Sequence, residues 1–326
     1  MQNSEYNIID LVKVCMAFIV VAIHTHPQNS CTVYWIRELL TNVYDLAVPF
    51  FFVASGFLLG IKICDAPNDE KLFKLKGYIW KTARLYVLWT FVYLPFTIYG
   101  CYIDGLGYIK SVAVFARNFL LVGENYMSWP LWYLLAVLVA VSLIYLMVKC
   151  NFNVRTMCLV GIFLVFLGYC LDKNIIPSSI YTSLFKTTRN GFFVGLPYIL
   201  IGMLIASKKS VSSVPKGALL SMLFVSFLFY VLGYKLAMFV VVYSFFSLIL
   251  QIDLEKAGKD LYRNLRLTST VIYFVHMLWV GIIIALPPLY TLSPILLFFV
   301  VAIMSLATAV IVVKKQDVKV VKLLFR

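Results

Sequence analysis

The first apolar segment, residues 8–26, carries three residues that could do chemistry. Asp10 and Lys13 are three positions apart, so they share a helix face and could form an ion pair. His24 follows Lys13 by 11 positions, which at about 100° per residue returns to within about 20° of the same direction, about 16 Å along the axis. Lys13 could therefore hold an anionic group at one end of a stripe, and the His24 imidazole could move a proton at the other.

Four further candidates lie in or beside other apolar segments. Arg189 could clamp an anionic substrate, although a plain surface arginine explains it equally well. Glu124 is interpreted as either a substrate contact or a solvated loop acid. Asp45 adds a charge near the outer end of the second segment. His276 lies near the middle of a late segment, and a pairing with His24 stays open because a sequence contains no distances between helices.

The composition indicates that membrane helices position these residues. The 326-residue chain is 63% hydrophobic and 13% charged, which is too apolar for a water-soluble globule. Its apolar runs reach the ~20 residues that a spanning helix needs. The N-terminus has no cationic head and no cleavage site follows the first run, which is therefore predicted to be a retained span. The predicted fold class is all-α, a polytopic membrane helix bundle.

Breaks at proline, glycine and charged residues predict about ten spans. They are 8–26, 38–61, 79–99, 130–148, 156–171, 191–206, 217–231, 236–250, 268–287 and 294–313. If the N-terminus is cytoplasmic, 20 of the 28 Lys and Arg residues face the cytoplasm and 7 face outward. Cationic residues stay on the inner side, so both termini are predicted to be cytoplasmic. The net charge of +14 then reflects contact with anionic lipid, and nucleic acid is not an expected partner.

The chain is predicted to be a single integral membrane domain over 1–326, with a short basic cytoplasmic tail at 314–326. We find no internal repeat and no long hydrophilic stretch. The seven cysteines are scattered without Cys-x-x-Cys or metal-ligand spacing, so no metal site is predicted. We interpret them as small buried hydrophobes. The sequence predicts no oligomeric state.

The second span contains two features with structural consequences. Pro49 lacks a backbone N–H and frees a carbonyl, and Ser55-Gly56 allows another helix or a ligand to approach closely. Ser55-Gly56 belongs to the stretch Phe50-Phe-Phe-Val-Ala-Ser-Gly-Phe-Leu58, which Pro49 immediately precedes. Small residues are usually packing devices, so this stretch alone indicates no function.

Taken together, the ordered motifs resemble membrane-bound acyltransferase family 3, a group of multispanning O-acyltransferases. The first span of that family carries Asp, then Arg or Lys, then ten residues and His, as at Asp10, Lys13 and His24. Its second span has a Phe-Phe-Phe-Val-x-Ser-Gly-Phe-Leu motif, and a late Tyr-Leu-x-His element is similar to Tyr273-Phe-Val-His276.

Two further elements are similar but depart from the family pattern. Lys81-Thr-Ala-Arg-Leu-Tyr86 resembles the Arg-rich entry to span three, without the proline that usually follows. Leu131-Trp-Tyr-Leu134 resembles a Leu-Trp-Phe-Leu element, with Pro130 where many members have His. Lysine at position 13 keeps the charge of arginine but loses its planar fork, which changes how a phosphate is held.

The resemblance implies an O-acetyltransferase of the plasma or inner membrane with no permanently bound cofactor. The donor would be a cytosolic acyl-CoA, with acetyl-CoA as the expected one, and the acceptor a hydroxyl of an extracytoplasmic glycan, cell-wall component or small molecule. His24 would be the general base. The donor phosphates would be held by Lys13, Lys81 and Arg84. Acceptor binding would involve Asp45, Glu124, Arg189 and His276.

An alternative function remains open on other residues. Asp45-Leu-Ala-Val-Pro-Phe-Phe-Phe52 and Thr188-Arg-Asn-Gly-Phe-Phe193 also resemble the membrane half of the vancomycin-resistance serine racemases, which is thought to handle serine. No racemase segment is expected before Arg326, so an isolated membrane half would act as a transporter of a serine-like amino acid. A non-catalytic assembly subunit is the third interpretation.

Overall fold

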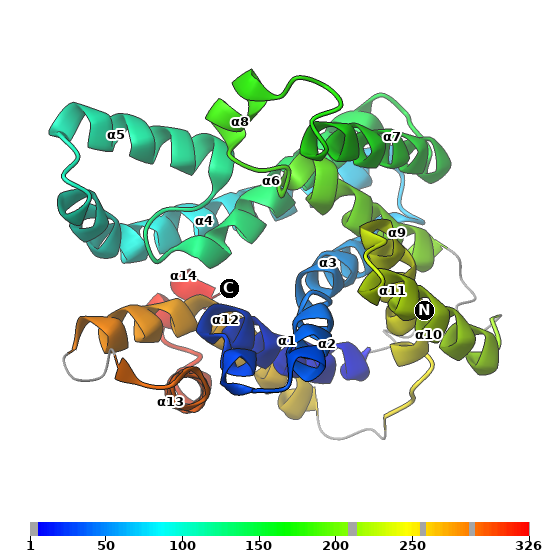
Figure 1. Ribbon diagram of the computed structural model, residues 1–326. Coiled ribbons are helices and arrows are strands. Elements are labelled where there is room, and N and C mark those ends of the chain that lie inside the picture. The colour runs from blue at the N-terminus through cyan, green and yellow to red at the C-terminus, as the bar shows by residue number, and fades with distance from the viewer. Residues whose placement is uncertain (1–5, 208–213, 255–258, 287–290, 326) are drawn as a thin grey trace. The chain divides into compact units, whose positions relative to one another are not determined.

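The structure is a computed structural model that describes residues 6–207, 214–254, 259–286 and 291–325 (Figure 1). Within these residues the chain forms helices and no β-strand, which confirms the all-α fold class. Some residues of the predicted basic inner side lie outside the described residues, as does the last residue of the predicted span 268–287. The basic residues concerned are Lys208, Lys209, Lys256 and Arg326.

Seven helical segments of the described residues are long and apolar enough to cross a membrane. They are α1 (Asn7–Thr25), α2 and α3 together (Tyr34–Ile63), α4 (Asn68–Ile103), α6 with the turn before it (Trp129–Lys149), α7 (Val154–Asp172), most of α12 (Asp260–Ala285) and α13 (Pro294–Lys314). Three shorter apolar segments coincide with the remaining predicted spans. They are Gly191–Ser207, Lys216–Val231 and Lys235–Ile249.

The chain divides into two compact units, each described here by itself. Unit 1 comprises Met1–Ala54 and Lys208–Phe325, and unit 2 comprises Ser55–Ser207. The boundary falls inside α3 (Ala47–Ile63). Whether the two units act as the single predicted domain stays a prediction.

Unit 1 is built around the long apolar helices α1, α12 (Lys259–Ala285) and α13, which pack on one another (Figure 1). Ala17 and Val21 of α1 are fully buried, and so are Val271 and Ile272 of α12. The spacing of four between the α1 pair places both side chains on one helix face. The other elements are η1 (Pro27–Ser30), α2 (Tyr34–Tyr44), α10 (Lys216–Val231), η6 (Lys235–Ala237), α11 (Met238–Ile249) and α14 (Lys319–Phe325).

Helices α1 and α12 run in the same direction. Asp10 near the start of α1 contacts Arg266 in the first third of α12, and His24 at the end of α1 contacts His276 further along α12. If both helices cross the membrane, an odd number of spans must separate them. Four of the seven long segments lie between them, so an odd number of the three shorter segments must also cross. This parity is consistent with ten spans; the count and the cytoplasmic position of the termini stay predictions.

The predicted span 38–61 is two helices rather than one. α2 ends at Tyr44 and α3 begins at Ala47, with Pro49 in the first turn of α3. A proline cannot donate to the carbonyl four residues before it, and its ring clashes with that carbonyl. The carbonyl in question belongs to Asp45, so the break occurs where Pro49 prevents a continuous helix.

Unit 2 packs α4 against α6 (Trp132–Lys149) and α7 against α9 (Leu196–Ser207). α4 is longer than the predicted span 79–99 because a charged first part, with the Glu70–Lys74 ion pair at 2.6 Å, extends the helix. Short elements connect these helices. They are α5 (Tyr108–Arg117), η2 (Asn118–Val122), η3 (Trp129–Leu131), α8 (Ser179–Phe185) and η4 (Gly191–Gly195).

All seven cysteines lie in described residues and carry free thiols. The interpretation that they are buried is wrong for six of them. Cys170 is buried, whereas Cys15 and Cys150 are exposed and the others are partly exposed. The reason is that spanning helices present apolar residues outward as well as inward, so apolar character does not place a residue in the interior.

We predict that Gly56→Ala destabilises the protein by about 1–3 kcal/mol, the usual cost of overpacking. A β-carbon at Gly56 would overlap the backbone carbonyl of Ile199, so α3 and α9 approach each other as closely as the Ser55-Gly56 pair predicts. Thermal unfolding in detergent measures the effect. The control is Gly77→Ala, because a β-carbon there meets nothing within 4 Å and alanine favours the helix. Equal behaviour of the two variants would contradict the prediction.

Candidate functional site

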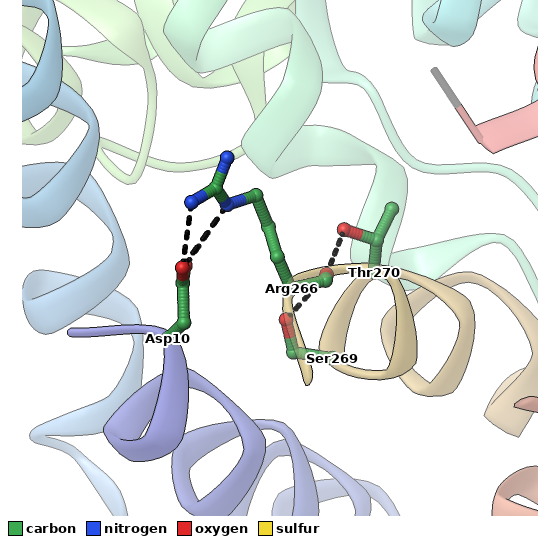
Figure 2. A network of polar contacts seen from close by, with 4 residues as sticks. All are labelled: Asp10, Arg266, Ser269 and Thr270. Carbon is green, nitrogen blue, oxygen red and sulfur yellow. Dashed lines mark hydrogen bonds and ion pairs between the residues drawn. The ribbon is translucent and has the colours of Figure 1, made fainter. Parts of the chain in front are cut away.

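An ion pair joins the start of α1 to α12 in unit 1 (Figure 2). The Arg266 Nη2 atom lies 2.7 Å from Asp10 Oδ2, and Arg266 Nε donates to both carboxylate oxygens at 3.1 and 3.2 Å. Asp10 is 3% exposed, so its charge is held almost entirely inside the protein. Such a planar two-point contact fixes orientation as well as distance. It therefore aligns the helix that carries His24 with the helix that carries His276.

The two imidazoles lie side by side at the other end of the same helix pair. The ring centroids of His24 and His276 are 5.3 Å apart, with 33° between the ring planes. His276 is completely buried, whereas His24 is partly exposed. The open question of their pairing is thus answered, because the two histidines are neighbours within unit 1.

The hydrogen bond of His276 defines its tautomer. Its Nδ1 lies 3.0 Å from the carbonyl oxygen of Ile272, one turn earlier in α12. A carbonyl only accepts, so Nδ1 carries the proton and, in the neutral ring, Nε2 has a free lone pair. Nε2 is buried and has no hydrogen-bond partner among the described residues. A buried polar atom of this kind is a candidate contact for a substrate or a water molecule.

The other predicted residues of α1 have different settings. Lys13 is partly buried on the same helix. His26 caps the end of α1 with φ 53° and is exposed. Of the two histidines at the end of α1, His24 lies beside the His276 ring.

Asp45 lies elsewhere in unit 1 and joins α2 to α10. The hydroxyl of Tyr230 donates to Asp45 Oδ2 at 2.6 Å, and the Lys235 ammonium lies 4.4 Å above the Tyr230 ring. Asp45 therefore has a structural role, because it connects the break between α2 and α3 to helix α10. Its predicted role in acceptor binding has no additional support.

The predicted donor-binding residues belong to different units. Lys81 and Arg84 lie on α4 in unit 2, whereas Lys13 lies in unit 1. Arg84 is partly buried, and its buried Nε has no hydrogen-bond partner among the described residues. A guanidinium with an unused inward donor can still bind an oxyanion. The joint phosphate site of Lys13, Lys81 and Arg84 stays a prediction.

Ser55 belongs to a group of hydroxyls in unit 2. Its Oγ lies 3.0 Å from the hydroxyl of Tyr133, and the Tyr78 hydroxyl also bonds to it. Both partners are phenols, which are poor bases at neutral pH. The contacts therefore give Ser55 no base that would activate it as a nucleophile.

Glu124 and Arg189 are brought together in unit 2. Arg189 Nη2 lies 3.5 Å from Glu124 Oε1, and the Arg189 guanidinium carbon lies 5.3 Å from the centre of the Trp132 ring. Burial raises the pKa of the Glu124 carboxyl, although Arg189 and, more weakly, Lys186 act to lower it. Both predicted acceptor contacts thus occupy one site, beside an aromatic residue of the Trp-Pro-Leu-Trp-Tyr segment.

This raised pKa predicts a pH-dependent contribution to stability. A carboxyl whose pKa is higher in the folded than in the unfolded state stabilises the fold below the unfolded pKa, and that contribution is lost as the pH rises through the folded pKa. We expect the unfolding temperature of the natural protein, relative to Glu124→Gln, to fall as the pH rises from the usual glutamate pKa of 4.5 through the raised pKa of Glu124. If the unfolding temperature of the natural protein relative to Glu124→Gln stays constant or rises over this pH interval, the pKa of Glu124 is not raised in the folded state.

Comparison with known protein families identifies the family of the chain. Residues 6–314 match the model of a family described as an acyltransferase domain, which includes α1, α12 and both histidines. The chain belongs to this acyltransferase family. The resemblance inferred from Asp10, Lys13 and His24 is therefore confirmed.

Part of this acyltransferase-family chain is also similar to longer proteins. It is 26% identical over 219 residues to a serine/alanine racemase of Enterococcus gallinarum and 28% identical over 221 residues to an amino-acid racemase of Enterococcus faecalis. The matches cover 65% and 64% of this chain but 30% of each racemase. No solved structure matches the chain. The likeness to serine racemases is thus confirmed for a region that spans less than a third of those proteins.

Sequence reasoning missed two residues that complete the contacts in unit 1. Arg266 was counted only as one of the basic inner residues, and Tyr230 was not singled out. A signal existed for Arg266, because a buried acid in a spanning helix requires a cation and Arg266 lies just before the predicted span 268–287. No comparable signal marks Tyr230, which is one of 21 tyrosines.

Proposed function

We propose that this acyltransferase-family protein moves an acetyl group from cytosolic acetyl-CoA to a hydroxyl of an extracytoplasmic glycan, cell-wall component or small molecule. The observation that supports the proposal is the His24–His276 pair on two aligned apolar helices of the family-matched region. An acyl transfer to a hydroxyl needs a base that titrates near neutral pH, and the partly exposed His24 is suited to this role.

In the proposed step, the hydroxyl oxygen of the acceptor attacks the thioester carbonyl while His24 takes the hydroxyl proton. The new C–O bond forms, the C–S bond breaks, and the proton is passed to the departing CoA thiolate. His276 is a positioning residue, because its ring lies beside that of His24 and its Nε2 lone pair is unused. A neutral imidazole beside the base favours the protonated form that His24 adopts during transfer.

The donor and the acceptor are held by different residues in this proposal. Lys13, Lys81 and Arg84 would hold the CoA phosphates, since cationic side chains bind phosphate oxygens by charge-assisted hydrogen bonds. Glu124 and Arg189 would form the acceptor site, in which Glu124 holds Arg189 until the acceptor binds. We place the protein in the plasma or inner membrane, in line with the seven long apolar segments.

The test uses the full-length protein in liposomes. Acetyl-labelled CoA is supplied on one face, and glucose, glucuronate, glucose 1-phosphate or serine on the other. Release of free CoA with transfer of the label, dependent on the protein, would support acetyl transfer. Passage of labelled serine across the bilayer without consumption of acetyl-CoA would contradict it and favour a transporter. Neither activity in correctly folded protein would also contradict it and favour an assembly subunit.

A further inference from the structure

Three basic side chains and one acid are linked by electrostatic contacts in the loops of unit 2. Arg117 ends α5 and donates from Nη1 to the carbonyl of Ser183 in α8 at 3.4 Å. Lys186 follows α8 directly and lies within electrostatic reach of both Arg117 and Glu124. Arg189 pairs with Glu124 at 3.5 Å. This group holds three cations and one carboxylate, and its excess of positive charge favours the approach of an anion.

The guanidinium of Arg189 is largely available for a further contact. Among the described residues, its side chain makes a single hydrogen bond, to Glu124. At 3.5 Å that bond is longer than a well-formed charge-assisted bond of about 2.7–2.9 Å. The Arg189 side chain is 64% exposed. Glu124 therefore holds the guanidinium loosely and leaves its planar fork open to a carboxylate or a phosphate.

Lys186 is held in an unfavourable conformation at this site. Its φ of 59° and ψ of −37° lie in the half of backbone space that side chains with a β-carbon rarely adopt. Burial lowers the pKa of the Lys186 ammonium, and repulsion by Arg117 lowers it further. Strain and like-charge repulsion persist where the surroundings impose them, and a bound anion would relieve the repulsion.

A cavity adjoins these charges. It has a volume of about 220 Å³ and is lined by Trp132, Phe185, Asn190 and Phe192, among other residues. The Arg189 guanidinium lies over the Trp132 ring, and Phe185 immediately precedes Lys186 in the chain. The cavity walls are thus aliphatic and aromatic, and two of the cations, Lys186 and Arg189, adjoin residues that line it. Apolar walls suit the apolar face of a small ring-shaped molecule, and the cations suit an oxyanion attached to it.

We propose that Arg117, Lys186 and Arg189, together with the Trp132 cavity, bind an acceptor whose hydroxyl-bearing ring carries an oxyanion, either a carboxylate or a phosphate. This inference rests on the proposed function and names the class of its acceptor. Glu124 keeps Arg189 in position in the free protein, and the oxyanion of the acceptor replaces Glu124 as the partner of Arg189.

Binding is tested on the full-length protein in nanodiscs by calorimetry, without an acyl donor. Glucuronate and glucose 1-phosphate are the anionic probes, and glucose is the neutral control. We expect the anionic probes to bind at least about 10-fold more tightly than glucose, the factor that a charge-assisted hydrogen bond of about 1.4 kcal/mol provides. A preference for glucuronate over glucose 1-phosphate identifies a carboxylate acceptor, and the reverse identifies a phosphate acceptor.

The variants separate a local site from general charge. Arg189→Gln should lose about 10-fold or more in affinity for the anionic probe, whereas Lys110→Gln, the same charge change on exposed α5, should have little effect. Glu124→Gln should tighten anion binding because the competing carboxylate is removed, and a folding defect cannot produce that gain. Equal binding of glucose and the anions would overturn the inference, and so would Arg189→Gln binding like the natural protein.

These outcomes are independent of the acyltransferase assay. If the anions bind as expected but no acetyl group leaves CoA, the proposed function fails and the anion site stands. If acetyl transfer occurs while anion binding is absent or insensitive to Arg189, the proposed function stands and the acceptor class is wrong.

Discussion

Replacement of His24 by asparagine is expected to abolish acetyl transfer in liposomes. Loss of a general base reduces the rate by about 10²–10⁴-fold, and asparagine cannot take a proton from the acceptor hydroxyl. His24 lies in the last turn of α1 and is partly exposed, so the fold should tolerate the change. The measurement is the initial rate of label transfer from acetyl-CoA at saturating donor concentration.

The matched control for this variant lies two residues away. His26→Asn removes an imidazole from the same end of α1, and asparagine tolerates the left-handed conformation of His26 at φ 53°. We expect near-normal activity for His26→Asn. His276→Gln should lower the rate and shift its pH profile, which loss of packing alone would not do. Normal activity in His24→Asn, or equal loss in both asparagine variants, would remove His24 from the mechanism.

Removal of Arg266 is expected to produce the largest loss of stability. Arg266→Gln leaves the Asp10 carboxylate, which is 3% exposed, without its bidentate partner. Breaking a buried ion pair costs about 3–5 kcal/mol; because the Arg266 side chain is 64% exposed and partly screened by its surroundings, we expect a loss of about 2–3 kcal/mol. The measurement is the free energy of unfolding of the purified protein in detergent.

A double-mutant cycle separates the pair from its surroundings. Asp10→Asn combined with Arg266→Gln should be more stable than the sum of the single changes predicts, because no unpaired buried charge remains. The control is Lys322→Gln, which removes an exposed pair with Asp317 at 3.7 Å and should change stability by less than about 1 kcal/mol. Additive effects of the two single changes would show that the pair does not couple α1 to α12.

The outline of the fold could be predicted because it depends on local properties of the chain. Each predicted span coincides with a long or short apolar helical segment, since hydrocarbon length sets the number of apolar residues that a helix needs. The break in the second span was not predicted. The structure shows the break between α2 and α3, and Pro49 explains it. The Ser55-Gly56 pair marked a close helix approach in advance, because glycine removes the atom that would prevent it.

The candidate site could be predicted in part, and the missing part has one cause. Helical periodicity defines which side chains share a face, so Asp10, Lys13 and His24 were singled out from α1 alone. Periodicity carries no information about which helix lies opposite that face. The pairing of Glu124 with Arg189 and the separation of Lys81 and Arg84 from unit 1 were therefore not accessible from spacing.

By itself, the sequence determined that the chain is a helical membrane protein with a cation and an imidazole along its first span. Both follow from composition and from the fixed geometry of a single helix. Only the tertiary structure decided that Arg266 holds Asp10 and that His276 lies beside His24. These contacts join residues more than 250 positions apart, and the packing of α1 on α12 selects them from many apolar faces of similar character.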